Sequence, residues 1–226
     1  QQHQMLEHVK SYSGMSPDPN TGIFALLTNL ASVEGYDGFR VTTLNSFFMG
    51  CYNLRSIPYF DTSICGTFAL ALFDCRSITK IPPYDYRLSS SMFQTFSSCI
   101  RVKTAENVNA PSSYTFWATF SGMRSLTSIA GLVTTGSVTF DNLLANASAL
   151  TSVPFFDTSR CVTATSMFQN SAVIDLPNLD FTKVVVGTTM FSAASLRTIG
   201  NSAFPSLVTA DNFFSGCQAL VAWPSA

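Results

Sequence analysis

The sequence predicts an α/β repeat solenoid of about nine coils, each with one short strand and one short helical or 3₁₀ turn. Residues 51–63 read CYNLRSIPYFDTS and residues 147–159 read ASALTSVPFFDTS, so nearly the same stretch recurs four periods of 24 residues later. Apolar residues repeat at fixed positions with the same period, and the stretches between them carry proline, serine and threonine. The recurrence predicts stacked repeat units, the apolar positions predict their shared core, and the stretches between them predict the elements within each unit.

An apolar series with a period of 23–24 residues runs along most of the chain. Cys51 is followed three and six residues later by Leu54 and Ile57, and we place equivalent anchor residues at nine positions. These anchors are Leu27, Cys51, Cys75, Cys99, Met123, Ala147, Asn170, Ala193 and Cys217. One unit cannot bury its own apolar face, whereas stacked units form a continuous core. We therefore expect a shared core that contains Leu54, Ile57, Leu126, Leu150 and Leu196.

The segments within each unit suggest its elements. LRSIPYF and LTSVPFF are short, apolar and interrupted by proline, which is typical of a brief strand. SSSMFQTF and TATSMFQNS place Ser or Thr before a bulky pair, which predicts one helical or 3₁₀ turn with an N-cap. We assign residues 23–226 to the solenoid and residues 1–22 to an N-terminal cap or linker, with a short helix in MLEHVK at residues 5–10.

The repeat resembles the BspA-like class of leucine-rich repeats and the related repeats of mycoplasma lipoproteins. The resemblance rests on the pattern F-x-x-C-x-x-L-x-x-I-P, followed by F-D-T-S and a Met-Phe pair, and it covers roughly residues 24–224. Several units lack the Cys or the Pro of this pattern. The resemblance implies a leucine-rich-repeat-like fold and a surface protein of a bacterium, protozoan or phage particle that is adhesive and not catalytic.

Composition excludes several function classes. The formal net charge is -1 and no arginine-rich segment occurs, so we expect no nucleic-acid partner. The apolar runs are far shorter than the ~18 residues of a membrane span. The two histidines, His3 and His8, precede the first repeat, so the solenoid contains neither a Ser-His-Asp nor a Cys-His set. We expect no enzyme activity, no cofactor and no metal.

Aspartates recur ten residues after several anchors, at Asp37, Asp61, Asp85, Asp157 and Asp180. A residue that recurs at one repeat position is usually structural, and Asp before Thr-Ser accepts backbone N–H bonds in a turn. Two alternatives are a calcium site built from stacked carboxylates and a catalytic pair of the kind that cleaves glycosides.

The cysteines also follow the repeat. Cys51, Cys75, Cys99 and Cys217 are anchors, whereas Cys65 and Cys161 lie fourteen residues after an anchor. The favoured interpretation is a buried free thiol at each site, although a disulfide between neighbouring rungs of Cys51, Cys75 and Cys99 stays open. We expect reducing agents to leave thermal stability nearly unchanged.

The positions between the inward-facing residues of each strand vary from unit to unit, and we expect them to form a nearly uncharged binding surface. The candidate contact residues are Tyr59, Lys80, Pro83, Asn107, Phe155, Asn178 and Asn201. The favoured function is a non-catalytic recognition or adhesion module on a cell surface or virus particle, such as a phage tail fibre or receptor-binding protein, with a protein or glycan receptor. The alternatives are a purely structural part of a virion or surface layer and a carboxylate-based carbohydrate-active enzyme.

The last unit, FFSGCQALVAWPSA, contains no polar closing helix. Repeat stacks normally need an atypical capping unit, so we expect this end to be covered by another copy, a partner chain or further sequence. Our preferred interpretation is an oligomer contact at Phe214, Leu220 and Trp223.

Overall fold

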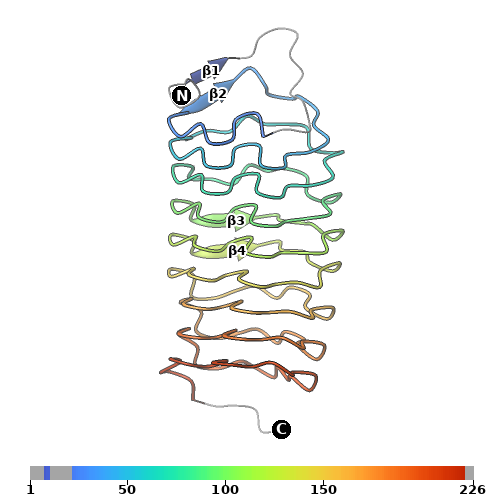
Figure 1. Cartoon of the computed structure of the whole chain (residues 1–226), viewed down its shortest axis with the longest axis vertical. Coiled ribbons are helices and arrows are strands. Elements are labelled where there is room, and N and C mark those ends of the chain that lie inside the picture. Colours follow the sequence, from blue (N-terminus) through green and yellow to red (C-terminus); the bar gives the residue numbers. More distant parts are fainter. Residues whose placement is uncertain (1–7, 11–21, 222–226) are drawn as a thin grey trace.

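The chain winds into a stack of coils that follow one another in sequence order along the long axis of the molecule (Figure 1). The computed structural model describes residues 8–10 and 22–221. Two parallel strand pairs occur: β1 (His8–Lys10) with β2 (Ser32–Glu34), and β3 (Thr104–Glu106) with β4 (Ser128–Ala130). Isolated parallel bridges, such as those from Thr115 to Thr139 and from Thr139 to Thr163, connect further coils.

The predicted leucine-rich-repeat-like α/β solenoid is wrong. Within residues 8–10 and 22–221 no α-helix or 3₁₀ helix forms, and the regular strands are four segments of three residues each. The coils instead consist mostly of turns and irregular backbone. The predicted helix over residues 5–10 is also wrong where it is described, because His8–Lys10 form strand β1 and the His8 ring bonds the Ser32 hydroxyl.

The expected helical turn is replaced by what we call the turn wall, which comprises residues 44–50, 68–74, 92–98, 116–122, 140–146, 164–170, 187–193 and 210–216. In the second of these segments the amides of Leu70, Leu72 and Asp74 donate to carbonyls of the next coil, at 2.8–3.0 Å. The amides between them, those of Ala71 and Phe73, donate to the carbonyl three residues earlier. The same alternation recurs from coil to coil. The bonds between coils in this wall therefore form a ladder in which each amide donates towards the C-terminal end of the stack.

Backbone handedness explains why no helix continues through this wall. One residue directly before each buried anchor adopts positive φ, as Asp74 does at 60°. From the second coil on, the residue four positions earlier also has positive φ, as Leu70 does at 57°. The residues with positive φ directly before the buried position of Cys51 and its structural equivalents are Leu26, Gly50, Asp74, Ser98, Gly122, Asn146, Asn170, Ala193 and Gly216. A left-handed residue interrupts the run of right-handed residues that a helix requires. The Ser/Thr signal therefore marks a turn and not a helix N-terminus.

This column also corrects two of the predicted anchors. Asn170 and Ala193 occupy the exposed left-handed position, and the buried equivalents of Cys51 are Ser171 and Ala194. The amides of Ser171 and Ala194 donate to Phe168 and Phe191, as that of Cys51 does to Phe48. These coils are one residue shorter than the others, and the missing residue therefore lies after the anchor residue and not before it.

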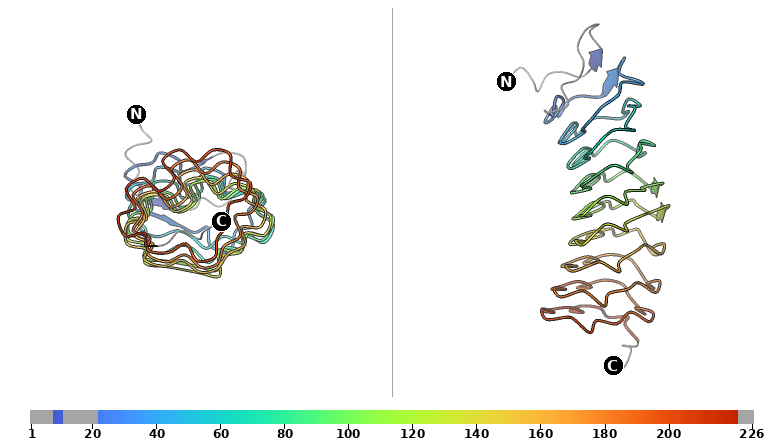
Figure 2. Two further views of the ribbon diagram at one scale, coloured as in Figure 1. Left: turned by 90° about the horizontal axis from the view of Figure 1, so that it is seen from below. Right: turned by 90° about the vertical axis from the view of Figure 1, so that its right-hand side faces the viewer.

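One apolar core fills the interior of the stack. Leu54, Leu126, Leu150 and Leu196 are buried in a single cluster as predicted, and Ile57 packs against it while remaining partly exposed. Phenylalanine rings stack between neighbouring coils, for example Phe24 on Phe48 at 5.3 Å between ring centroids and Phe168 on Phe191 at 5.5 Å. The end-on view in Figure 2 shows the coils superposed around this interior.

All six cysteines are free thiols, and Cys217 is the one that is half-buried. The thiol of Cys51 donates to the Phe24 carbonyl at 2.8 Å, and those of Cys75 and Cys99 donate to Phe48 and Leu72. Burial raises the pKa of Cys51 to about 12 and that of Cys65 to about 11. Since the thiolate is the reactive form, these thiols serve packing and backbone bonding.

Replacing Leu150 with alanine should lower the free energy of unfolding by about 2–5 kcal/mol, because Leu150 is fully buried and its loss leaves a cavity. Leu88→Ala is the matched control, since Leu88 is 56% exposed and should cost less than about 0.5 kcal/mol. Chemical denaturation measures both values. Equal costs for the two variants would contradict the assigned core.

Candidate functional site

The face opposite the turn wall, which we call the strand-side wall, carries the predicted contact residues. It comprises residues 31–36, 55–60, 79–84, 103–108, 127–132, 151–156, 174–179 and 197–202, and it contains β2, β3 and β4. In β3 and β4 the middle residue is buried and its neighbours are exposed, so side chains alternate between core and solvent. All seven predicted residues are exposed: Tyr59, Lys80, Pro83, Asn107, Phe155, Asn178 and Asn201.

Three of these residues, Tyr59, Lys80 and Pro83, line one groove between two neighbouring coils. Its volume is about 290 Å³. The other residues that line it are Arg55, Ser56, Ile57, Ile78, Thr79, Ile81 and Pro82. The groove is therefore mostly apolar, with two cationic side chains and three hydroxyl-bearing side chains in its lining.

Proline and tyrosine shape the contact between the two coils at this groove. Pro58, Pro82 and Pro83 have no amide hydrogen and cannot donate to a ladder between coils. The buried Tyr84 hydroxyl instead donates to the Pro58 carbonyl at 2.8 Å and bridges the two coils. The amide of Tyr59 donates to the Asp37 carboxylate at 2.8 Å, which fixes the backbone that carries the exposed ring.

Asn178 and Asn201 come together in a second groove, of about 270 Å³, with Asp180, Phe181 and Thr182 among its lining residues. The amide of Asn201 donates to the Asn178 side chain at 3.2 Å, so part of this polar surface is already paired within the protein. Asn107 and Phe155 line neither groove. The predicted surface is thus divided into separate places and does not form one continuous site.

Arg55 and Thr79 were missed by the sequence prediction. They lie four residues after their anchors, one position before the variable column that contains Lys80. Lys103 occupies the same position in the next coil. The two cations at this position, Arg55 and Lys103, are the signal that could have found Arg55.

Four of the five recurring aspartates have the turn role that the sequence favours, whereas Asp37 accepts the amide of Tyr59 from the next coil. Asp61, Asp85, Asp157 and Asp180 each accept a backbone bond from the residue two positions later, at 2.9–3.0 Å. Hydrogen bonds lower the pKa of Asp61, Asp85 and Asp180; for Asp85 the main partner is the Arg87 side chain. A carboxylate held in its ionised form by a turn is poorly suited to general acid catalysis.

In the described part of the chain, no group of three or more His, Cys, Asp or Glu residues could hold a metal ion. The same part contains no helix with the length and apolar character of a membrane span.

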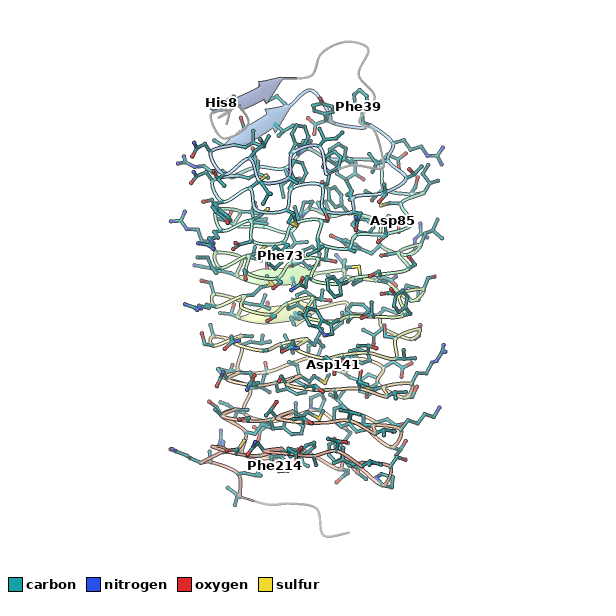
Figure 3. The ribbon with its side chains drawn as sticks, in the orientation of Figure 1. His8, Phe39, Phe73, Asp85, Asp141 and Phe214 are labelled. Atoms are coloured by element: carbon teal, nitrogen blue, oxygen red, sulfur yellow. The ribbon has the colours of Figure 1, made fainter. Side chains whose placement is uncertain are left out.

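The predicted oligomer contact is only partly described. Phe214 lies in the last coil (Figure 3), where its ring stacks on Phe191 at 5.2 Å. Phe214 and Leu220 are partly buried against the core. Trp223 lies outside the described residues, and the contact itself stays a prediction.

Comparisons with models of protein families, with curated proteins and with solved structures found no match for this chain.

Asp85→Asn should lower the melting temperature at neutral pH, because the wild-type carboxylate pairs with Arg87 at 2.6 Å. The side-chain amide of the variant can still accept the backbone bond from Arg87, but it carries no charge. The folded pKa of Asp85 lies below the unfolded value of about 3.9, so this stabilisation is present above that value and disappears as the pH falls through the folded pKa. The gap between the two melting curves should therefore close in acid.

Glu106→Gln controls for the loss of one exposed surface charge. Melting curves from neutral pH to strong acid measure the effect. A gap between wild type and Asp85→Asn that is the same at both extremes would contradict the assignment.

Proposed function

We propose that this protein is a non-catalytic recognition module that binds a receptor through the groove of Tyr59, Lys80 and Pro83. The observation that carries the proposal is the convergence of three variable, exposed positions from neighbouring coils on one mostly apolar groove. Ligand sites are typically concave and apolar with a few polar groups. The hydrogen bonds of the turn wall hold the groove on a rigid support, which reduces the entropy lost on binding.

The proposed setting is the exterior of a cell or a virus particle, where an adhesive module meets its receptor. The engagement of the recurring aspartates in turns supports a non-catalytic role. Tyr59 is 54% exposed, and exposed aromatic residues are frequent anchors of recognition surfaces.

Tyr59→Ala should weaken binding of the purified chain to its receptor by about tenfold or more, because an aromatic anchor typically contributes over 1.4 kcal/mol. Binding to panels of cells, with and without prior removal of surface glycans or proteins, measures the loss and identifies the receptor class. Phe155→Ala is the control, since Phe155 is an equally placed aromatic residue outside the groove. Absence of binding to every panel, or undiminished binding by Tyr59→Ala, would refute the proposal.

A second candidate function, also proposed here, is a structural part of a virion or surface layer. It is favoured by an apolar stripe that crosses consecutive coils, defined by Tyr114, Val138, Val162, Val185 and Val208. Each of the four valines donates its amide to the stripe residue of the preceding coil, at 2.8–3.0 Å. Tyr114, Val162 and Val208 are exposed, and contiguous exposed apolar surface commonly marks an interface.

A second copy of the chain fits this stripe best. Another stack with the same pitch can match the stripe at every coil. Arg160 and Lys183 precede stripe residues by two positions, whereas Asp141 and Asp211 follow stripe residues by three. A two-fold axis parallel to the stack would therefore place the basic edge of one copy against the acidic edge of the other.

Val162→Lys should convert such an assembly to monomers, because it places a charge in the centre of the stripe. Sedimentation velocity over a wide range of protein concentrations measures the change, with Phe155→Lys on the strand-side wall as control. A wild-type monomer at every concentration, or no effect of Val162→Lys, would contradict this second candidate.

A further inference from the structure

We infer that the groove of Tyr59, Lys80 and Pro83 binds a carboxylated sugar, such as a uronic acid at the end of a glycan. The inference rests on the proposed recognition function and specifies its ligand class. Three properties of the groove carry it: uncompensated positive charge, an exposed ring beside apolar walls, and a size that suits a small saccharide.

The charge of the groove is positive and unpaired. Arg55 and Lys80 line it, and its lining contains no Asp or Glu. Within residues 8–10 and 22–221 the ion pairs are Arg40–Asp61, Arg76–Asp74 and Arg87–Asp85, and none of them uses Arg55 or Lys80.

Neighbouring coils modify this charge without removing it from the groove. Lys103 lies at the position of Arg55 two coils further on. Glu34 lies at the position of Pro58 one coil earlier, and Glu106 lies at the position of Pro82 one coil further on. None of these three residues lines the groove. An anionic ligand group is therefore the natural partner of Arg55 and Lys80, and Arg in particular pairs with carboxylates through two parallel hydrogen bonds.

The rest of the groove suits the ring of a sugar. The Tyr59 ring and the apolar side chains of Ile57, Ile81 and Pro83 offer surface for the C–H face of a pyranose. Ser56 and Thr79 supply hydroxyls that both donate and accept hydrogen bonds, as sugar hydroxyls require. The volume of about 290 Å³ accommodates one or two sugar rings.

The chain contains its own charge-reversed counterpart of this site. Phe155 occupies the repeat position of Tyr59. Asp175 pairs with Ser152 in a parallel bridge, and this pairing places Asp175 at the repeat position of Lys80. Thr151 stands where Arg55 stands. The same backbone therefore presents one aromatic residue beside cations and another beside an anion, and only the first suits a carboxylate.

The test uses the full chain and a matched pair of disaccharides, one ending in glucuronic acid and the other with that carboxyl group reduced to the alcohol. Titration followed by amide chemical shifts measures both affinities and locates the binding residues. We expect the acidic disaccharide to bind at least about tenfold more tightly, with shifts centred on residues 55–59 and 79–83 and an affinity that falls with salt.

Four variants in the groove and one control outside it assign the contributions. Arg55→Gln and Lys80→Gln should each remove most of the preference for the acidic disaccharide, while Tyr59→Ala should weaken both sugars and Tyr59→Phe should retain binding. Phe155→Ala should change nothing. All of these positions are exposed, so folding is not expected to be affected.

Equal affinity for the two disaccharides, or binding of neither, would overturn the inference. If receptor binding on cells still depends on Tyr59 in that case, the recognition function stands and only its ligand class is wrong. Binding of a short apolar peptide through its free C-terminal carboxylate, without binding of the acidic sugar, would overturn the inference in favour of a protein ligand.

Discussion

The hydrogen bonds of the turn wall determine the rest of the structure. In each coil alternate amides, such as those of Leu70, Leu72 and Asp74, donate to carbonyls of the next coil. This geometry requires left-handed residues at two positions per coil, and most of the residues found there are not glycine. Left-handed backbone costs roughly 1–2 kcal/mol for such a residue. The cost is offset by the hydrogen bonds between coils and by the apolar core that the stacking buries.

The strand-side wall can be irregular because the turn wall is regular. Where prolines remove donors, as at Pro58 and Pro82, the coils remain aligned through the opposite wall and through the Tyr84 hydroxyl. The groove at Tyr59 forms at such a place. A rigid ladder on one side therefore permits variable side chains and a groove on the other.

The sequence predicted the buried leucines and three residues of the candidate groove, but not the local backbone. Leu70, Gln94 and Ala118 have no intrinsic preference for positive φ, so nothing in their local sequence marks them as left-handed; hydrogen bonding to the next coil imposes it. The shifted anchors had a detectable signal, since Asn146 and Asn170 lie 24 residues apart and asparagine tolerates positive φ. Arg55 was missed because it lies four residues after its anchor, whereas the predicted contact residues lie five or eight residues after theirs.

The hydrogen bonds of the turn wall are tested most directly by detecting scalar couplings across hydrogen bonds by NMR on the deuterated, isotope-labelled chain. We expect couplings from the amide nitrogen of Leu70 to the carbonyl carbon of Phe93, and from the amide nitrogens of Leu72 and Asp74 to the carbonyl carbons of Thr95 and Ser97. Couplings from these amides to carbonyls four residues earlier in the same coil would show a helix in place of the turn wall and would contradict the account.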